Sequence, residues 1–183
     1  MLDPKDGPAL APGARPYWLV LTSGLTDPHV DRNEPGVAED DRMAGLGYEL
    51  CASARDEPSW ATSLLFDLVR YVLTERRDLS PGDTMDFGES LSRGSACSAV
   101  VFAPPRFFHG LQELPTGHYG WLHVLPVTAD ELAWAQREST PALVELLYRT
   151  GAAPDVTLTR KSVLIPANSA VIEQVLVAAR RLR

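Results

Sequence analysis

Three histidines and one glutamate are the residues of this chain that could hold a metal ion. His109, His118 and His123 follow one another closely, and Glu113 lies between the first two. Zinc sites use such side chains at short, fixed spacings, as in H-E-x-x-H or C-x-x-C. Neither motif is present, and His118 and His123 are separated by an expected turn into a strand. We therefore expect no metal ion and no other cofactor.

The candidate nucleophiles also lack a catalytic context. Ser23 and Ser95 lie outside a G-x-S-x-G turn, which is the arrangement that exposes the serine of α/β-hydrolases. Cys51 and Cys97 would each need a histidine close in space to become nucleophilic. Glu49 falls in an expected strand, where its carboxylate either faces solvent or accepts hydrogen bonds in a pocket. A hydrolase with a carboxylate or Cys–His site is thus one hypothesis among others.

The composition is that of one acidic globular domain. The chain has 183 residues, of which 45% are hydrophobic and 22% are charged, and this length suits a single domain. The net charge of −7 argues against nonspecific nucleic-acid binding, which needs a cationic surface, and mildly favours a basic protein partner. No apolar run approaches the roughly 18 residues that a membrane span requires. Two isolated cysteines indicate free thiols and a cytoplasmic protein.

Four helices are expected in the part of the chain that must position these residues. An apolar stripe at three- and four-residue spacing predicts a helix over residues 59–75, with Ser59 as its cap. A capping box at Thr128 starts a helix that runs to residue 137. Thr140 followed by proline starts another, which runs to residue 149. The fourth helix covers residues 168–182.

Short apolar runs between turn signals predict the strands. These are residues 17–23, 47–52, 84–87, 97–102 and 119–127, with a possible hairpin of 156–158 and 162–165. Residues 24–42 and 104–116 are expected to be loops, and residues 1–16 a flexible, proline-rich lead-in to a single domain at 17–183. The mixture lacks a regular βαβ rhythm. It predicts an α+β fold with a mixed, largely antiparallel sheet and helices packed on it.

Several short motifs occur in an order that matches one protein family. They are residues 21–27 (LTSGLTD), 47–50 (GYEL), Trp60, 68–72 (LVRYV), 82–83, 122–126 with Thr128, Glu131 and Leu132, and 143–149 (LVELLYR). Together they resemble the suppressor of fused (SUFU) domain between about residues 18 and 166. The family is known for binding protein segments.

The resemblance implies a binding edge. In animal members this domain is one half of a two-domain clamp, and a transcription-factor peptide joins the sheet as an added strand. Two gripping residues of this half match Tyr71 and Asp83, which are twelve residues apart here as in the family. The strand that accepts the peptide corresponds to Thr84, Met85, Asp86 and Phe87. A further acidic gripping residue of the family falls near Ala103, and this sequence contains only one of the two domains.

The sequence and the resemblance together predict a non-catalytic protein-binding domain. Single SUFU domains of bacteria resemble immunity proteins that neutralise a toxin encoded beside them, and the composition is more typical of a bacterial chain. We expect a protein partner, either a toxin domain or an extended peptide, and neither nucleic acid nor a membrane. The alternatives are a hydrolase and an accessory domain without a dedicated site. A cleft that gathers Glu49, Asp83 and a histidine would favour the hydrolase.

Overall fold

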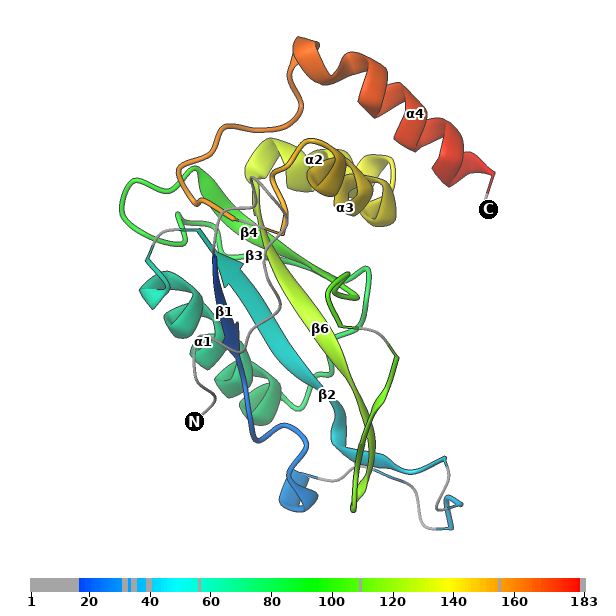
Figure 1. Cartoon of the computed structure of the whole chain (residues 1–183). Coiled ribbons are helices and arrows are strands. Elements are labelled where there is room, and N and C mark those ends of the chain that lie inside the picture. The colour runs from blue at the N-terminus through cyan, green and yellow to red at the C-terminus, as the bar shows by residue number, and fades with distance from the viewer. Residues whose placement is uncertain are drawn as a thin grey trace, which may run out of the picture.

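A mixed sheet with helices on both faces forms the described part of the chain (Figure 1). The structure is a computed structural model, and it describes residues 17–30, 33, 36–38, 41–55, 57–108, 110–154 and 156–181. The expected lead-in at residues 1–16 lies outside these ranges. Within them, no helix is long and apolar enough to cross a membrane.

The sheet has the spatial order β1–β2–β6–β4–β3, and β5 pairs with the first part of β6. Its strands are β1 (Trp18–Leu21), β2 (Met43–Ala54), β3 (Thr84–Asp86), β4 (Cys97–Ala103), β5 (Gln112–Leu114) and β6 (Gly117–Thr128). The central pair β2–β6 is parallel, and the other pairs are antiparallel. The prediction of a mixed, largely antiparallel sheet is therefore confirmed. The strands β1 and β3 lie at its two ends.

The helices lie on opposite faces of this sheet (Figure 1). They are α1 (Ser59–Glu75), α2 (Ala129–Arg137), α3 (Thr140–Arg149) and α4 (Ser169–Arg180), with short 3-10 turns η1 (Pro28–Val30) and η3 (Pro166–Asn168). Helix α1 covers one face, and α2 and α3 cover the upper part of the other. Helix α4 lies farther out and packs on α3.

The protein has one hydrophobic core on each face of the sheet. The strands contribute to both, because successive side chains point to opposite faces. The face under α1 buries Leu50, Val100, Phe102, Leu122 and Val124 against Leu64, Leu65, Leu68 and Val72 of the helix. The face under α2 and α3 buries Val101, Leu125 and Val127 against Leu132, Leu143, Leu146 and Leu147. Each fully buried leucine or valine contributes about 1.5–3 kcal/mol.

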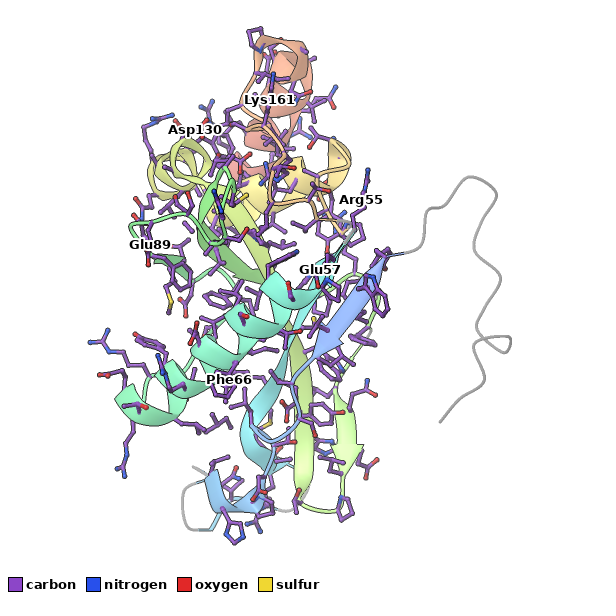
Figure 2. All side chains as sticks on the ribbon, turned by 90° about the vertical axis from the view of Figure 1, so that its left-hand side faces the viewer. Arg55, Glu57, Phe66, Glu89, Asp130 and Lys161 are labelled. Atoms are coloured by element: carbon purple, nitrogen blue, oxygen red, sulfur yellow. The ribbon has the colours of Figure 1, made fainter. Side chains whose placement is uncertain are left out.

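The start of α1 differs from the prediction in its cap. Pro58 is the N-cap residue, and its side chain makes no capping hydrogen bond. The backbone N–H of Ser59 donates to Glu57 Oε1 at 3.0 Å, and its hydroxyl donates to Glu57 Oε2. Glu57, which lies just before the start of the helix in Figure 2, therefore satisfies the N–H of Ser59, whereas Ser59 as the cap would have accepted from an N–H two or three residues later.

The predicted hairpin at residues 156–165 is wrong. Val156 O accepts from Arg55 N at 2.9 Å, and Leu158 O accepts from Ala96 N at 3.0 Å. Val163 N donates to the carboxylate of Glu131 at 2.7 Å. The backbone of this segment thus bonds to other parts of the chain, so that it forms an irregular, partly buried connection instead of two paired strands.

Described parts of the two predicted loops pair with or pack on the sheet. Residues 104–116 contain β5, which continues the edge of β6 beyond the end of β4. In residues 24–42, Leu25 is only 1% exposed, and its carbonyl accepts from Leu46 N at 2.7 Å. Gly45 has φ of +56°, and a Cβ there would collide with that carbonyl oxygen. Only glycine allows the loop to lie so close to β2.

Candidate functional site

The end strand β3 presents a short row of backbone groups that have no hydrogen-bond partner among the described residues. Phe102 N donates to Asp83 O at 3.0 Å, and Phe87 N donates to Ser98 O at 3.0 Å. Alternate residues of an antiparallel strand direct their N–H and C=O groups to opposite sides. The backbone groups of Thr84 and Asp86 therefore point away from β4, toward the open end of the sheet. The resemblance predicted this edge as residues 84–87, and the strand itself covers residues 84–86.

Asp83 closes the turn that leads into this edge. Its backbone N–H donates to Ser80 O at 3.0 Å, and Gly82 at the third position of the turn has φ of +97°. With Pro81 before the glycine, these are the features of a type II turn. The carboxylate of Asp83 also accepts from Ser80 N at 2.8 Å, yet the residue stays exposed. Asp83 thus stabilises the turn and still presents its charge beside β3.

Tyr71 lies one turn before the end of α1 and is half-buried against the core of that face. Among the described residues, its hydroxyl has no hydrogen-bond partner and makes no bond to Asp83. Tyr48 differs, because its hydroxyl accepts from Leu79 N at 3.2 Å. A partly buried tyrosine usually pairs its hydroxyl. The Tyr71 hydroxyl is therefore available to another molecule.

The other residues of the predicted edge divide by exposure. Met85 and Phe87 are half-buried against the α1-side core, and Thr84 is also half-buried. Asp86 is exposed, and its carboxylate accepts from Gly88 N at 2.9 Å. The apolar side chains hold the strand in place, while Asp86 faces solvent beside the unpaired backbone groups.

An apolar hollow of about 180 Å³ lies beside the same turn. It is lined by Pro81, Gly82, Phe102, Ala103, Pro104, Arg106, Thr140, Pro141, Val144 and Glu145. Hydrogen bonds from Arg149 and Arg106 lower the pKa of Glu145. The ion pair of Arg106 and Glu145 therefore lies in the wall of the hollow. Ala103, near which the resemblance sets an acidic gripping residue of the family, contributes only a methyl group to its wall.

A buried chain of Ser53, His123 and Tyr148 is the arrangement that the sequence did not reveal. His123 Nε2 lies 3.1 Å from Ser53 Oγ, and Nδ1 lies 3.1 Å from the hydroxyl of Tyr148. The three residues come from β2, β6 and α3, and no short motif joins them. Ser53 and His123 are both 0% exposed.

The hydrogen bonds of Ser53, His123 and Tyr148 run in the direction that stabilises the fold and not in the direction that activates a nucleophile. The Ser53 hydroxyl donates to Pro154 O, so its oxygen accepts from His123 Nε2–H. His123 Nδ1 then accepts from Tyr148. Burial lowers the pKa of His123 to about 3, which fits a neutral imidazole with both nitrogens satisfied. An activated serine would instead donate its proton to the imidazole.

The Cys–His pair of the hydrolase hypothesis also has the wrong chemistry. Cys51 is the register partner of His123 across β2 and β6. Burial raises the pKa of Cys51 to about 12, and the nucleophilic form of cysteine is the thiolate. Asp83 lies on the far side of the sheet from β2, beyond β6 and β4. The cleft of Glu49, Asp83 and a histidine is therefore not assembled.

Glu49 is a structural residue at the other side of the sheet. Its carboxylate accepts from Thr22 Oγ1 at 2.5 Å, Gly24 N at 2.8 Å, Thr26 N at 3.0 Å and Thr26 Oγ1 at 2.8 Å. It is 3% exposed. The four bonds fix the loop after β1 on β2, so that the side chain has little capacity left for a ligand.

The histidines are likewise dispersed. His118 and His123 have opposite parity on β6 and face opposite sides of the sheet, and His109 lies outside the described residues. Within the part of the chain that the structure describes, no three His, Cys, Asp or Glu side chains are grouped to hold a metal ion.

Comparison with known sequences decides the family. A sequence model described as "Suppressor of fused protein (SUFU)" matches residues 3–161. The chain belongs to the suppressor of fused family. The human suppressor of fused homolog is 25% identical over 138 residues, which are 72% of this chain and 28% of the human protein. This SUFU chain thus spans less than a third of that relative.

Solved structures show the same SUFU fold. The crystal structure of Drosophila Suppressor of Fused matches with a TM-score of 0.71 at 24% identity, over 87% of this chain and 42% of that one. The Sufu–Fu complex matches with a TM-score of 0.68 at 21% identity, over 88% and 74% of the two chains. The second structure records a SUFU protein bound to a protein partner.

Proposed function

We propose that this SUFU domain is a non-catalytic module that binds an extended segment of a partner protein as an added strand beside β3. The observation that carries the proposal is the open edge, with unpaired backbone groups at Thr84 and Asp86. Such an edge is the template for strand addition. The bound state of a relative, the Sufu–Fu complex, supports a protein partner.

Asp83, in the turn before β3, and Tyr71, on α1, are proposed to select the register of the added segment. The Tyr71 hydroxyl has no partner among the described residues and can bond to the segment. Asp83 keeps one carboxylate oxygen for Ser80 N, and the other can accept from the ligand. Both are therefore proposed as contact residues.

The acidic residues around β3 favour a partner segment that is positively charged. Asp83, Asp86 and Glu89 are all exposed at or next to β3, and Figure 2 shows Glu89 in the loop that follows the strand. The net charge of −7 would steer a cationic partner toward the domain. An apolar side chain of the same segment fits the hollow of about 180 Å³ beside the turn.

The finer form of the proposal is that the partner is a toxin domain, which this chain neutralises in the cytoplasm as an immunity protein. The support is the resemblance to single bacterial SUFU domains and the two free, buried cysteines among the described residues, which suit a reducing compartment. The first binding probe is therefore the purified product of the adjacent gene.

Proline substitutions at the two sheet ends test the edge. Thr84→Pro removes an N–H that points away from β4 and should abolish binding of the adjacent-gene product in isothermal titration calorimetry. Leu21→Pro is the matched control, because its N–H points outward from β1 in the same way. Thr22 N, one residue later, bonds to Leu50 O of β2. Retained binding by Thr84→Pro, or loss only with Leu21→Pro, would place the contact elsewhere.

Conservative variants test the two side chains. Tyr71→Phe with Asp83→Asn removes one hydroxyl and one charge, while the asparagine oxygen still accepts from Ser80 N. Binding should weaken by about tenfold or more, since each lost bond to a partner contributes about 1 kcal/mol. The urea midpoint of the double variant should match that of the parent. Unchanged affinity with an intact fold would assign both residues to structure alone.

A further inference from the structure

Helix α4 has one face on the domain and another face open to solvent. Val175 is its one fully buried residue, and Val171, Ile172, Leu176 and Ala179 pack on the α3-side core. Figure 1 shows α4 as the outermost element, beyond α2 and α3. It also lies after residue 161, where the match to the family ends. Its outer face is thus separate from the β3 edge.

The outer face carries a continuous stripe, which we call the α4 stripe. It consists of Ala170, Glu173, Gln174, Val177, Ala178 and Arg181, which line a shallow, solvent-open hollow of about 380 Å³. Their spacing of three and four residues keeps them on one side of the helix. Val177 is 43% exposed. Ala170, Ala178 and the exposed valine leave room between the longer side chains for another helix to approach.

The charges of the α4 stripe on one copy of the chain complement those of the same stripe on a second copy. Glu173 lies four residues before Val177, and Arg181 lies four residues after it. If two α4 helices cross antiparallel at Val177, each Glu173 comes to the same height as Arg181 of the other copy. Because the interface is isologous, the Glu173–Arg181 ion pair then forms twice, once on each side of the two-fold axis. Neither residue forms an ion pair with another described residue of its own chain.

We propose that a second copy of this chain covers the α4 stripe, with the two helices antiparallel about a two-fold axis at Val177. A single helix pair is smaller than a standard interface of about 1,600 Å², so that the dimer should be weak, with a Kd of about 10–100 µM. The dimer leaves both β3 edges open.

Sedimentation velocity on the full chain tests the proposal between about 5 and about 300 µM, a range that brackets the expected Kd. The mean mass should rise from monomer toward dimer with concentration. Glu173→Arg and Arg181→Glu should each raise Kd at least tenfold, because each places like charges opposite one another. Combining both reversals should restore dimerisation. Arg93→Glu, in the exposed loop before β4, is the control for overall charge.

Three results would overturn the proposal. The first is a monomer at every concentration. The second is a dimer that survives Val177→Asp with unchanged Kd, which would locate the interface elsewhere. The third is a double reversal that stays monomeric while its circular dichroism spectrum and urea midpoint match the parent. Since α4 packs through its opposite face, all of these variants should keep the fold.

Discussion

At the scale of single residues, Glu49 explains why two separated motifs occur together. The motif at 21–27 supplies Thr22, Gly24 and Thr26, and the motif at 47–50 supplies the carboxylate that binds them. The hydroxyls and amides are donors, and the buried carboxylate accepts from all of them at once. The two motifs are therefore one structural unit.

Replacing Glu49 should destabilise the fold. In Glu49→Gln, an amide NH₂ group faces donors of the loop, so that buried N–H groups lose their acceptors. We expect the free energy of unfolding to fall by about 3 kcal/mol, measured by urea denaturation. Glu113→Gln, on the exposed strand β5, is the matched control and should change it by less than about 0.5 kcal/mol. Equal, small effects would contradict the structural role of Glu49.

His123 makes stability depend on pH in a defined direction. Its pKa in the folded chain is about 3 because burial disfavours the charged imidazole, whereas an unfolded histidine titrates near 6.5. Below pH 6.5 the unfolded chain therefore binds a proton that the folded chain does not. Linkage then favours unfolding as pH falls.

The expected loss is about 2 kcal/mol between pH 7.5 and pH 5. Most carboxylates stay ionised in this window, so that His123 should dominate the change. Urea denaturation at several pH values measures it in the parent and in His123→Gln. The variant is less stable overall, and its slope in this window should be flatter by the contribution of one proton. An identical slope in both chains would show that the folded imidazole is protonated.

At the scale of elements, the sequence predicted helices and strands best where the hydrophobic periodicity agreed with the capping and turn residues. The apolar stripe of α1 and the capping box of α2 marked both helices correctly, since Thr128 and Glu131 form the expected reciprocal bonds. The edge strand β3 was predicted because a Pro-Gly-Asp turn precedes it. Tyr71 and Asp83 had no signal of their own, and only the family resemblance pointed to them.

The segment at 156–165 shows why the rest was not predictable. Short apolar runs are buried whether they form strands or irregular structure, and only distant partners decide between the two. Here the decisive partner is Glu131 of α2, which binds Arg160 through Nη1 at 2.6 Å and Nη2 at 2.7 Å as well as Val163 N. No sequence pattern near residue 160 predicts the contact with Glu131.

Breaking this buried pair should be costly. Arg160→Met leaves the carboxylate of Glu131, which is 0% exposed, without its cation. The free energy of unfolding should fall by about 3–5 kcal/mol. Arg149→Met breaks the more exposed pair with Glu145 and should cost about 1 kcal/mol or less. Urea denaturation compares the two, and similar losses would mean that Arg160 does not hold the segment.

At the scale of the whole molecule, both thiols are buried in the sheet. Burial raises the pKa of Cys51 to about 12 and that of Cys97 to about 11. Cys51 lies on the central strand β2, and Cys97 begins β4. A thiol reagent can reach either side chain only after the sheet opens.

Thiol labelling should therefore report on unfolding. The native chain should react with Ellman's reagent at pH 7.5 at far less than one thiol over an hour, and both thiols should react at once in denaturing urea. The native labelling rate should rise in Glu49→Gln in proportion to its lost stability. Rapid native reaction of Cys51 would contradict the close packing between β2 and β6.

The parallel pairing of β2 with β6 has a consequence for synthesis on the ribosome. Ser53 and His123, which meet at the centre of the sheet, are 70 residues apart in the chain. At about 5–20 residues per second, β6 emerges roughly 4–14 s after β2. During that interval β2 has β1 along its outer edge and α1 on its apolar face, while its inner edge is open. The nascent chain is therefore exposed to aggregation until β6 arrives, which makes it a natural substrate for chaperones that act during translation.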